Sequence, residues 1–201
     1  MAFEALREGN RRFVSQLGSA GASHARRREL PADQEPLAII LGCSDARVPA
    51  ELVFDQGLGD LFVIRVAGNI VAPSQVGSVE FAAEAFHTRL VVVLGHSSCG
   101  AVRATLQQLA RPRQEQSRNL SSIVDRIRPA VVGLLEGPRH DPQTLEQLAV
   151  RANIRMAADH LRHGSAVLEQ LIRTDGLVVV GAEYSLETGM VDFFDGVPAP
   201  Q

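Results

Sequence analysis

The sequence contains no lysine, no tryptophan and only two cysteines among its 201 residues. It also has no apolar run that approaches the roughly 20 residues of a membrane-spanning helix, so we expect no membrane segment. The two cysteines, Cys43 and Cys99, allow at most one disulfide, which would be unusual in a cytosolic chain of this size. We therefore interpret both cysteines first as free thiols, which are often buried in a protein core.

The charge balance excludes a further class of partner. Twenty basic residues, all of them arginine, stand against 23 acidic ones, and the net charge of −3 differs from the strongly basic character of most nucleic-acid-binding domains. We therefore expect no nucleic-acid partner. Residues 1–17 mix charged and apolar side chains without a continuous secretory core, which predicts a cytoplasmic protein. The length suits a single domain over residues 1–201.

The order of apolar segments indicates the fold class. Residues 1–30 are interpreted as a helical arm with few apolar side chains, which we expect to pack on a partner subunit. Continuous apolar runs then indicate strands buried on both faces, as in a parallel sheet covered by helices. We predict an α/β fold with a mainly parallel sheet of strand order 2-1-3-4, an antiparallel C-terminal edge strand and flanking helices. The predicted strands are residues 37–41, 61–66, 90–94, 177–180 and 190–194, the first, third and fourth ended by Gly42, Gly95 and Gly181, and the predicted helices are 50–54, 76–86, 99–110, 119–135 and 145–172, with a break at Gly164.

Both cysteines and one histidine lie just beyond predicted strands. Cys43 comes two residues after the first strand, His96 two residues after the third, and Cys99 three residues later. Open α/β sheets bind ligands at the carboxyl ends of their strands, where the strand order reverses, so we expect these side chains to converge. Two sulfurs and one imidazole suit Zn²⁺ and leave its fourth position open, as in catalytic zinc sites.

The residues after Cys43 add a carboxylate and a guanidinium group. Asp45 and Arg47 stand two positions apart in a predicted loop beside this metal site. Arg47 can hold the carboxylate in a bidentate pair, whereas an unpaired Asp45 can ligate the metal or accept a proton from water. The alternative is an ordinary loop ion pair, which would contribute about 0–1 kcal/mol if exposed.

Three motifs together resemble the β-class carbonic anhydrases. They are residues 43–47 (CSDAR), 60–69 (DLFVIRVAGN) and 95–100 (GHSSCG), while segments 6–13 (LREGNRRF) and 181–189 (GAEYSLETG) are similar to bacterial members and extend the resemblance nearly end to end. The resemblance implies a zinc enzyme that reversibly hydrates CO₂ to bicarbonate and a proton by attack of zinc-bound hydroxide.

The resemblance also implies a role for individual residues. Cys43, His96 and Cys99 would be the zinc ligands. Asp45 and Arg47 would form the catalytic dyad, with Asp45 able to become a fourth ligand in a closed state.

Four further positions match substrate-binding residues of the family. Gln34 would reach the substrate from across a dimer interface, and Gly100 would offer its backbone amide. Phe62 and Phe81 would line an apolar cleft, Phe81 standing where many members carry tyrosine. The resemblance therefore implies a homodimer or a dimer of dimers, with the arm formed by residues 1–30 embracing the partner.

Three other functions fit parts of the same sequence. A zinc hydrolase of carbonyl sulfide or carbon disulfide would use the same residues with a differently shaped cleft. A non-catalytic zinc-binding subunit would have no need of Asp45 and Arg47. A redox dithiol protein would use Cys43 and Cys99, but it would leave His96 without a role, and the spacing is not that of Cys-x-x-Cys.

Overall fold

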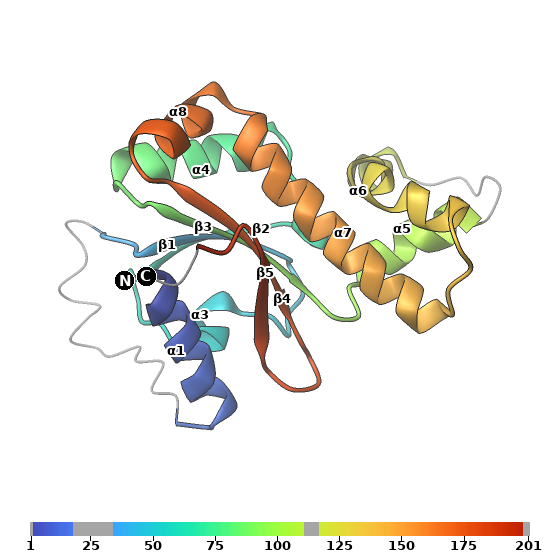
Figure 1. The fold of residues 1–201 in the computed structure, drawn as a ribbon, viewed down its shortest axis with the longest axis horizontal. Coiled ribbons are helices and arrows are strands. Elements are labelled where there is room, and N and C mark those ends of the chain that lie inside the picture. Colours follow the sequence, from blue (N-terminus) through green and yellow to red (C-terminus); the bar gives the residue numbers. More distant parts are fainter. Residues whose placement is uncertain (1, 18–33, 111–116, 199–201) are drawn as a thin grey trace.

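The computed structural model describes residues 2–17, 34–110 and 117–198. A five-stranded sheet with the order β2-β1-β3-β4-β5 forms its centre (Figure 1). The first four strands are parallel, and β5 pairs antiparallel with β4. This arrangement confirms the predicted order and the antiparallel edge strand. The strands are β1 (Ala38–Gly42), β2 (Leu61–Arg65), β3 (Leu90–His96), β4 (Val178–Tyr184) and β5 (Val191–Asp195).

Helices cover both faces of the sheet, with α1 and α3 on one side and α4, α7 and α8 on the other (Figure 1). Alternate strand residues therefore enter two different cores: Ile39 and Leu41 pack toward α4, α7 and α8, and Ile40 packs toward α1 and α3. Burial on both sides explains why the strands are continuously apolar. The helices are α1 (Ala2–Val14), α3 (Ala50–Val53), the 3₁₀ turn η1 (Ala67–Asn69), α4 (Pro73–Ala85), α5 (Gly100–Ala110), α6 (Arg118–Glu136), α7 (Pro142–His163) and α8 (Ala166–Thr174).

Two glycines that were predicted to end strands lie inside them. β3 continues through Gly95 to His96, and β4 continues through Gly181 to Tyr184. A Cβ atom on Gly95 would come within 2.5 Å of Ile154 on α7, and one on Gly181 within 2.9 Å. These glycines therefore allow α7 to pack closely on the sheet, and His96 is the last residue of β3 instead of lying two residues beyond the strand.

The N-terminal helix α1 packs on its own chain. Leu6 is fully buried in the core between α1, α3 and the sheet. The ring of Phe3 meets that of Phe193 edge-on, with centroids 4.9 Å apart. The helix predicted over residues 1–30 is confirmed for Ala2–Val14, while residues 18–30 lie outside the described residues. Packing of this arm on a partner subunit stays a prediction.

Within the described ranges, no helix is both long and apolar enough to cross a membrane.

Candidate metal centre

The ends of β1 and β3 bring the three predicted metal ligands together. Cys43 directly follows β1, His96 ends β3, and Cys99 directly precedes α5. β1 and β3 are neighbours in the sheet, and β2 lies on the other side of β1, so the strand order reverses at this point. The cluster therefore occupies the carboxyl edge of the sheet at the switch point, where open α/β folds bind ligands.

The geometry of the cluster fits a metal ion. The two Sγ atoms and an imidazole nitrogen lie within 4.8 Å of one another, and all three residues are buried. The Nδ1 atom of His96 lies 2.8 Å from the carbonyl oxygen of Ser97, to which it donates as the Nδ1–H tautomer. Its buried Nε2 atom then has no hydrogen-bond partner among the described residues, which is the state expected of a metal-ligating nitrogen. Thiolate and imidazole ligands with a fourth position open suit Zn²⁺.

The two thiols influence each other strongly. The Cys99 side chain, close to Cys43 in the cluster, lowers the pKa of Cys43 to about 4, against the opposing effect of burial. The same contact, together with burial, raises the pKa of Cys99. The two shifts are opposite in direction, so the pair favours a thiolate at Cys43 and a thiol at Cys99.

A backbone amide supports the first thiolate. The N–H of Gly68 donates to Cys43 Sγ at 3.3 Å, and the Gly68 carbonyl accepts from the buried Asn153 Nδ2 at 2.8 Å. Gly68 has a φ of 70°, in the left-handed region that glycine adopts readily. Sequence reasoning assigned no role to Gly68 or Asn153. Asn153, a polar residue on an otherwise apolar helix face, was the only local signal of this support.

The dyad predicted beside the metal is formed. Arg47 donates to both carboxylate oxygens of Asp45, from Nε at 2.9 Å and from Nη2 at 2.7 Å, and its backbone N–H donates at 3.0 Å. This fork lowers the pKa of Asp45 far below its usual value, so the carboxylate is charged at neutral pH. Asp45 Oδ2 lies 3.8 Å from the unpartnered Nε2 of His96. The carboxylate therefore borders the metal position while it is paired with Arg47.

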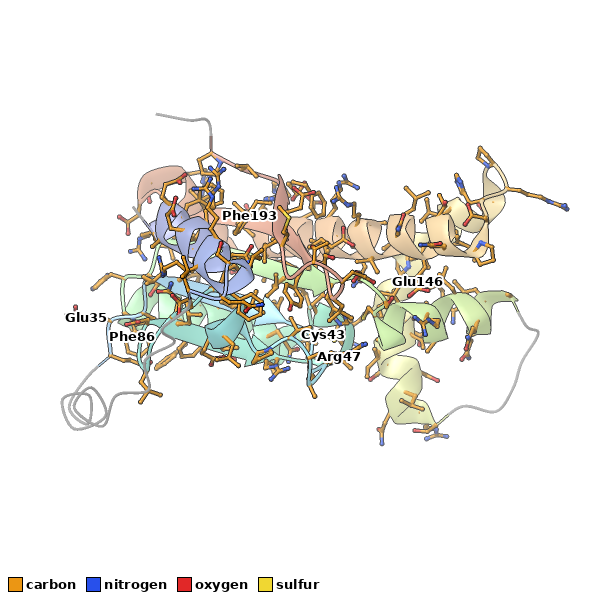
Figure 2. The ribbon with its side chains drawn as sticks, turned by 90° about the horizontal axis from the view of Figure 1, so that it is seen from below. Glu35, Cys43, Arg47, Phe86, Glu146 and Phe193 are labelled. Atoms are coloured by element: carbon orange, nitrogen blue, oxygen red, sulfur yellow. The ribbon has the colours of Figure 1, made fainter. Side chains whose placement is uncertain are left out.

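The loop that carries the dyad is fixed from β2. Arg65, the last residue of β2, donates to the carbonyl oxygens of Cys43 at 3.1 Å and Asp45 at 2.5 Å. Cys43 and Arg47 lie near each other where this loop leaves the sheet (Figure 2). A guanidinium from a neighbouring strand thus sets the backbone from which both a metal ligand and the carboxylate project.

Comparison with known proteins agrees with this geometry. A sequence model of the family described as carbonic anhydrase matches residues 38–191, which include the four parallel strands and only the first residue of β5. "Carbonic anhydrase 2" of Mycobacterium tuberculosis is 39% identical over 94% of this chain and 89% of its own length. A carbonic anhydrase of Mycolicibacterium smegmatis is 36% identical over 95% of this chain and 91% of its own. The structure of the β-carbonic anhydrase CcaA aligns with a TM-score of 0.73 and 26% identity over 99% of this chain and 92% of its own.

This chain belongs to the β-class carbonic anhydrase family. The family match and the relatives named carbonic anhydrase confirm the resemblance recognised from the three motifs and the prediction that the chain is an enzyme of this family. The fold alone is also similar to a β-carbonic anhydrase of Aspergillus fumigatus, with a TM-score of 0.78 and 22% identity over 98% of this chain and 92% of that one.

One of the four residues predicted to bind substrate in this family member lies beside the metal ligands. Gly100 is exposed, directly follows Cys99 and begins α5. A Cβ atom built on Gly100 would meet no described atom within 4 Å. Gly100 therefore lies at an exposed edge of the cluster.

The other three lie toward the amino ends of the strands. Phe62 pairs with Ile39 on β1, four residues before Cys43, which places it about 13 Å from the metal edge at ~3.3 Å per residue. Its ring packs 6.3 Å from that of Phe81 on α4, and Gln34 precedes β1. The fold does not bring these three side chains to the metal ligands of their own chain.

Proposed function

We propose that this chain catalyses the zinc-dependent, reversible hydration of CO₂ to bicarbonate and a proton. The observation that carries the proposal is the charged Asp45 carboxylate, held by Arg47 at 3.8 Å from a buried imidazole nitrogen that has no hydrogen-bond partner among the described residues. Cys43, His96 and Cys99 would hold the zinc ion. When bound, Zn²⁺ lowers the pKa of water toward neutrality and so supplies a nucleophile for CO₂.

The residues of the chain then have separate tasks. Asp45 accepts a hydrogen bond from the reacting water. This bond orients a lone pair of the water oxygen toward CO₂. Arg47 keeps the carboxylate off the metal position through its two-pronged contact. The Gly68 N–H draws charge from Cys43 Sγ, which limits how far that thiolate weakens the Lewis acidity of the metal.

The apolar part of the site would come from a second copy of the chain. Gln34, Phe62 and Phe81 lie away from the metal ligands of their own chain, and the Phe81 side chain is exposed. In a homodimer or a dimer of dimers, these residues would enclose CO₂ beside Gly100 of the other copy. The working unit would then be larger than one chain, as the resemblance implies.

Replacement of Asp45 tests the proposed reaction. We expect about one zinc per chain by elemental analysis and rapid CO₂ hydration by stopped-flow indicator assay. Asp45→Asn should lower kcat/KM by about 10²–10³-fold, because an oriented proton acceptor is lost, while zinc content stays unchanged. Asp125→Asn, which alters an exposed Asp–Arg pair on α6, is the matched control and should stay within twofold.

Three outcomes would overturn the proposal. Full activity in a zinc-free preparation would exclude the metal mechanism. Negligible CO₂ hydration with fast release of sulfide from carbonyl sulfide or carbon disulfide would assign the site to that hydrolysis instead. Reversible disulfide formation between Cys43 and Cys99 in a protein that binds no zinc would favour redox chemistry.

A further inference from the structure

The turn between β4 and β5 is tied to the loop that joins the ligands His96 and Cys99. The N–H of Ser97 donates to the Tyr184 carbonyl at 2.9 Å. The Ser97 hydroxyl accepts from the Leu186 N–H at 2.9 Å and donates to Glu187 Oε2 at 2.9 Å. The backbone N–H and the hydroxyl of Ser97 are therefore both bonded to the end of β4 or to the turn that follows it.

Ser97 in turn controls the imidazole ligand. Its carbonyl oxygen accepts the hydrogen bond from His96 Nδ1 at 2.8 Å, which fixes the ring orientation and directs Nε2 to the cluster. The next residue, Ser98, has a φ of 56°, in the left-handed region that residues other than glycine rarely adopt. Such a conformation persists only where surrounding contacts impose it, and Cys99 follows directly. The position of two ligands therefore depends on how firmly Ser97 is held.

We propose that Glu187 is a positioning residue of the metal centre, which acts through Ser97 to fix the imidazole of His96 and the approach to Cys99. The inference rests on the proposed zinc site and adds a supporting residue more than 80 positions away in the sequence. Removal of a residue that hydrogen-bonds to a metal-ligating histidine commonly lowers metal affinity or activity by about 10–100-fold. Because Glu187 acts through one intervening residue, we expect the lower end of that range.

The surroundings of Glu187 suit this role. Its carboxylate oxygen also accepts from the Ser185 hydroxyl at 3.1 Å, so two hydroxyl groups converge on one atom. These hydrogen bonds, that from Ser97 first, lower the pKa of Glu187 and keep the carboxylate charged at neutral pH. The side chain borders an open groove of about 330 Å³, which Ser98 and Glu146 also line. Replacement of Glu187 therefore leaves the packed cores unchanged.

Zinc release separates this role from a purely structural one. Glu187→Ala in the zinc-loaded enzyme should release zinc to a chelating indicator about tenfold faster than the wild type. Its Co²⁺-substituted form should show a shifted visible absorption band, because the imidazole is less firmly oriented. Glu187→Gln replaces the carboxylate with an amide, whose oxygen can still accept the hydrogen bond from Ser97. Zinc release should therefore return to within about threefold of the wild type. The KM for CO₂ should not change, because no substrate contact is removed.

A second pair of variants tests the connecting residue. Ser97→Ala removes the hydroxyl and should release zinc as fast as Glu187→Ala, whereas Ser97→Thr keeps the hydroxyl and should restore slow release. Glu84→Gln, at an exposed position on α4, is the charge-matched control and should behave as the wild type. Thermal unfolding of each variant shows whether the fold is retained.

The outcomes are distinct from those of the proposed function. Zinc release from folded Glu187→Ala within twofold of the wild type, with an unchanged Co²⁺ spectrum, would overturn the inference while leaving CO₂ hydration in place. If the wild type binds zinc but does not hydrate CO₂, the proposed function fails, and the zinc-release measurements still decide the role of Glu187. Equal zinc release from Ser97→Thr and Ser97→Ala would also contradict the inference.

Discussion

The two ends of the central sheet are built in opposite ways. At the carboxyl end, three buried side chains from the ends of β1 and β3 converge within 4.8 Å, and a charged dyad borders them. At the amino end, the rings of Phe62, Phe81 and Phe86 pack against one another with centroids 5.5–6.3 Å apart, and Phe81 is 56% exposed. Figure 2 shows Phe86 well separated from Cys43 and Arg47.

From this difference we infer which part of the proposed active site one chain supplies alone. The proposed metal ligands and the dyad are held by hydrogen bonds within the chain, from Arg65, Gly68 and Ser97. The aromatic cluster instead exposes a large apolar ring, and an exposed apolar surface of this kind often marks a contact site. We therefore expect the polar chemistry to be complete in one chain and the apolar cleft to require two.

The largest effect should follow from changing a histidine at the carboxyl end. His96→Ala removes one of three ligands and should lower both zinc occupancy and CO₂ hydration, the latter by more than about 10³-fold, because the nucleophile depends on the metal. The matched control is His87, which precedes β3 at the opposite end of the strand and has a φ of 52°. His87→Asn, which tolerates that conformation, should keep activity within twofold. Loss of zinc from His87→Asn would contradict the separation of the two ends.

The carboxyl end was largely predictable from the sequence, because its chemistry is local. Cys43, His96 and Cys99 are chemically distinctive residue types placed at strand ends, and the strand order that joins them follows from the continuous apolar runs. Asp45 and Arg47 are two positions apart, so the short loop alone brings them within reach.

Long-range packing was less predictable. Gly95 and Gly181 look like strand ends in the sequence, but their lack of a side chain serves the approach of Ile154, which lies 59 and 27 positions away. The contact of Asn153 with Gly68 spans 85 positions. No local pattern encodes such pairs, since they depend on where α7 crosses the sheet.

An intermediate effect should follow from changes in the aromatic cluster. The double variant Phe62→Ala and Phe81→Ala should lower kcat/KM by about tenfold and weaken self-association, because apolar surface at the proposed cleft and interface is lost. Zinc content should stay at the wild-type level. Chromatographic mass and zinc analysis of the same sample separate the two effects.

Mixed dimers test which chain supplies these rings. The double phenylalanine variant keeps an intact metal centre, and Asp45→Asn keeps an intact aromatic cluster. If the rings act on the other chain, each mixed dimer contains one complete site, and co-expression should give about threefold the activity of the double phenylalanine variant, which alone keeps about a tenth. Activity no higher than the mean of the two parents would show that the rings serve their own chain or none.

The smallest effect on turnover should come from α1, whose Asn10 binds backbone groups of Gly189 and Val191, two and four residues beyond Glu187. The Asn10 side chain donates to the carbonyl oxygens of Val53 at 3.1 Å and Gly189 at 2.9 Å, and it accepts from the Val191 N–H at 2.9 Å. Asn10→Ala leaves these backbone groups without a partner, which should lower the free energy of unfolding by about 1–3 kcal/mol. For a chain of this length, that corresponds to a fall in Tm of ~2–4 °C per kcal/mol.

Turnover and zinc release should nevertheless stay within about threefold of the wild type, because the contacts of Glu187 with Ser97 are untouched. Glu4→Gln, on the exposed face of the same helix, is the control and should change neither property. Dissociation of the oligomer by Asn10→Ala, without a lower Tm, would instead mean that α1 acts mainly across the interface. The arm would then belong with the aromatic cluster, as a part of the enzyme that functions only in a second copy.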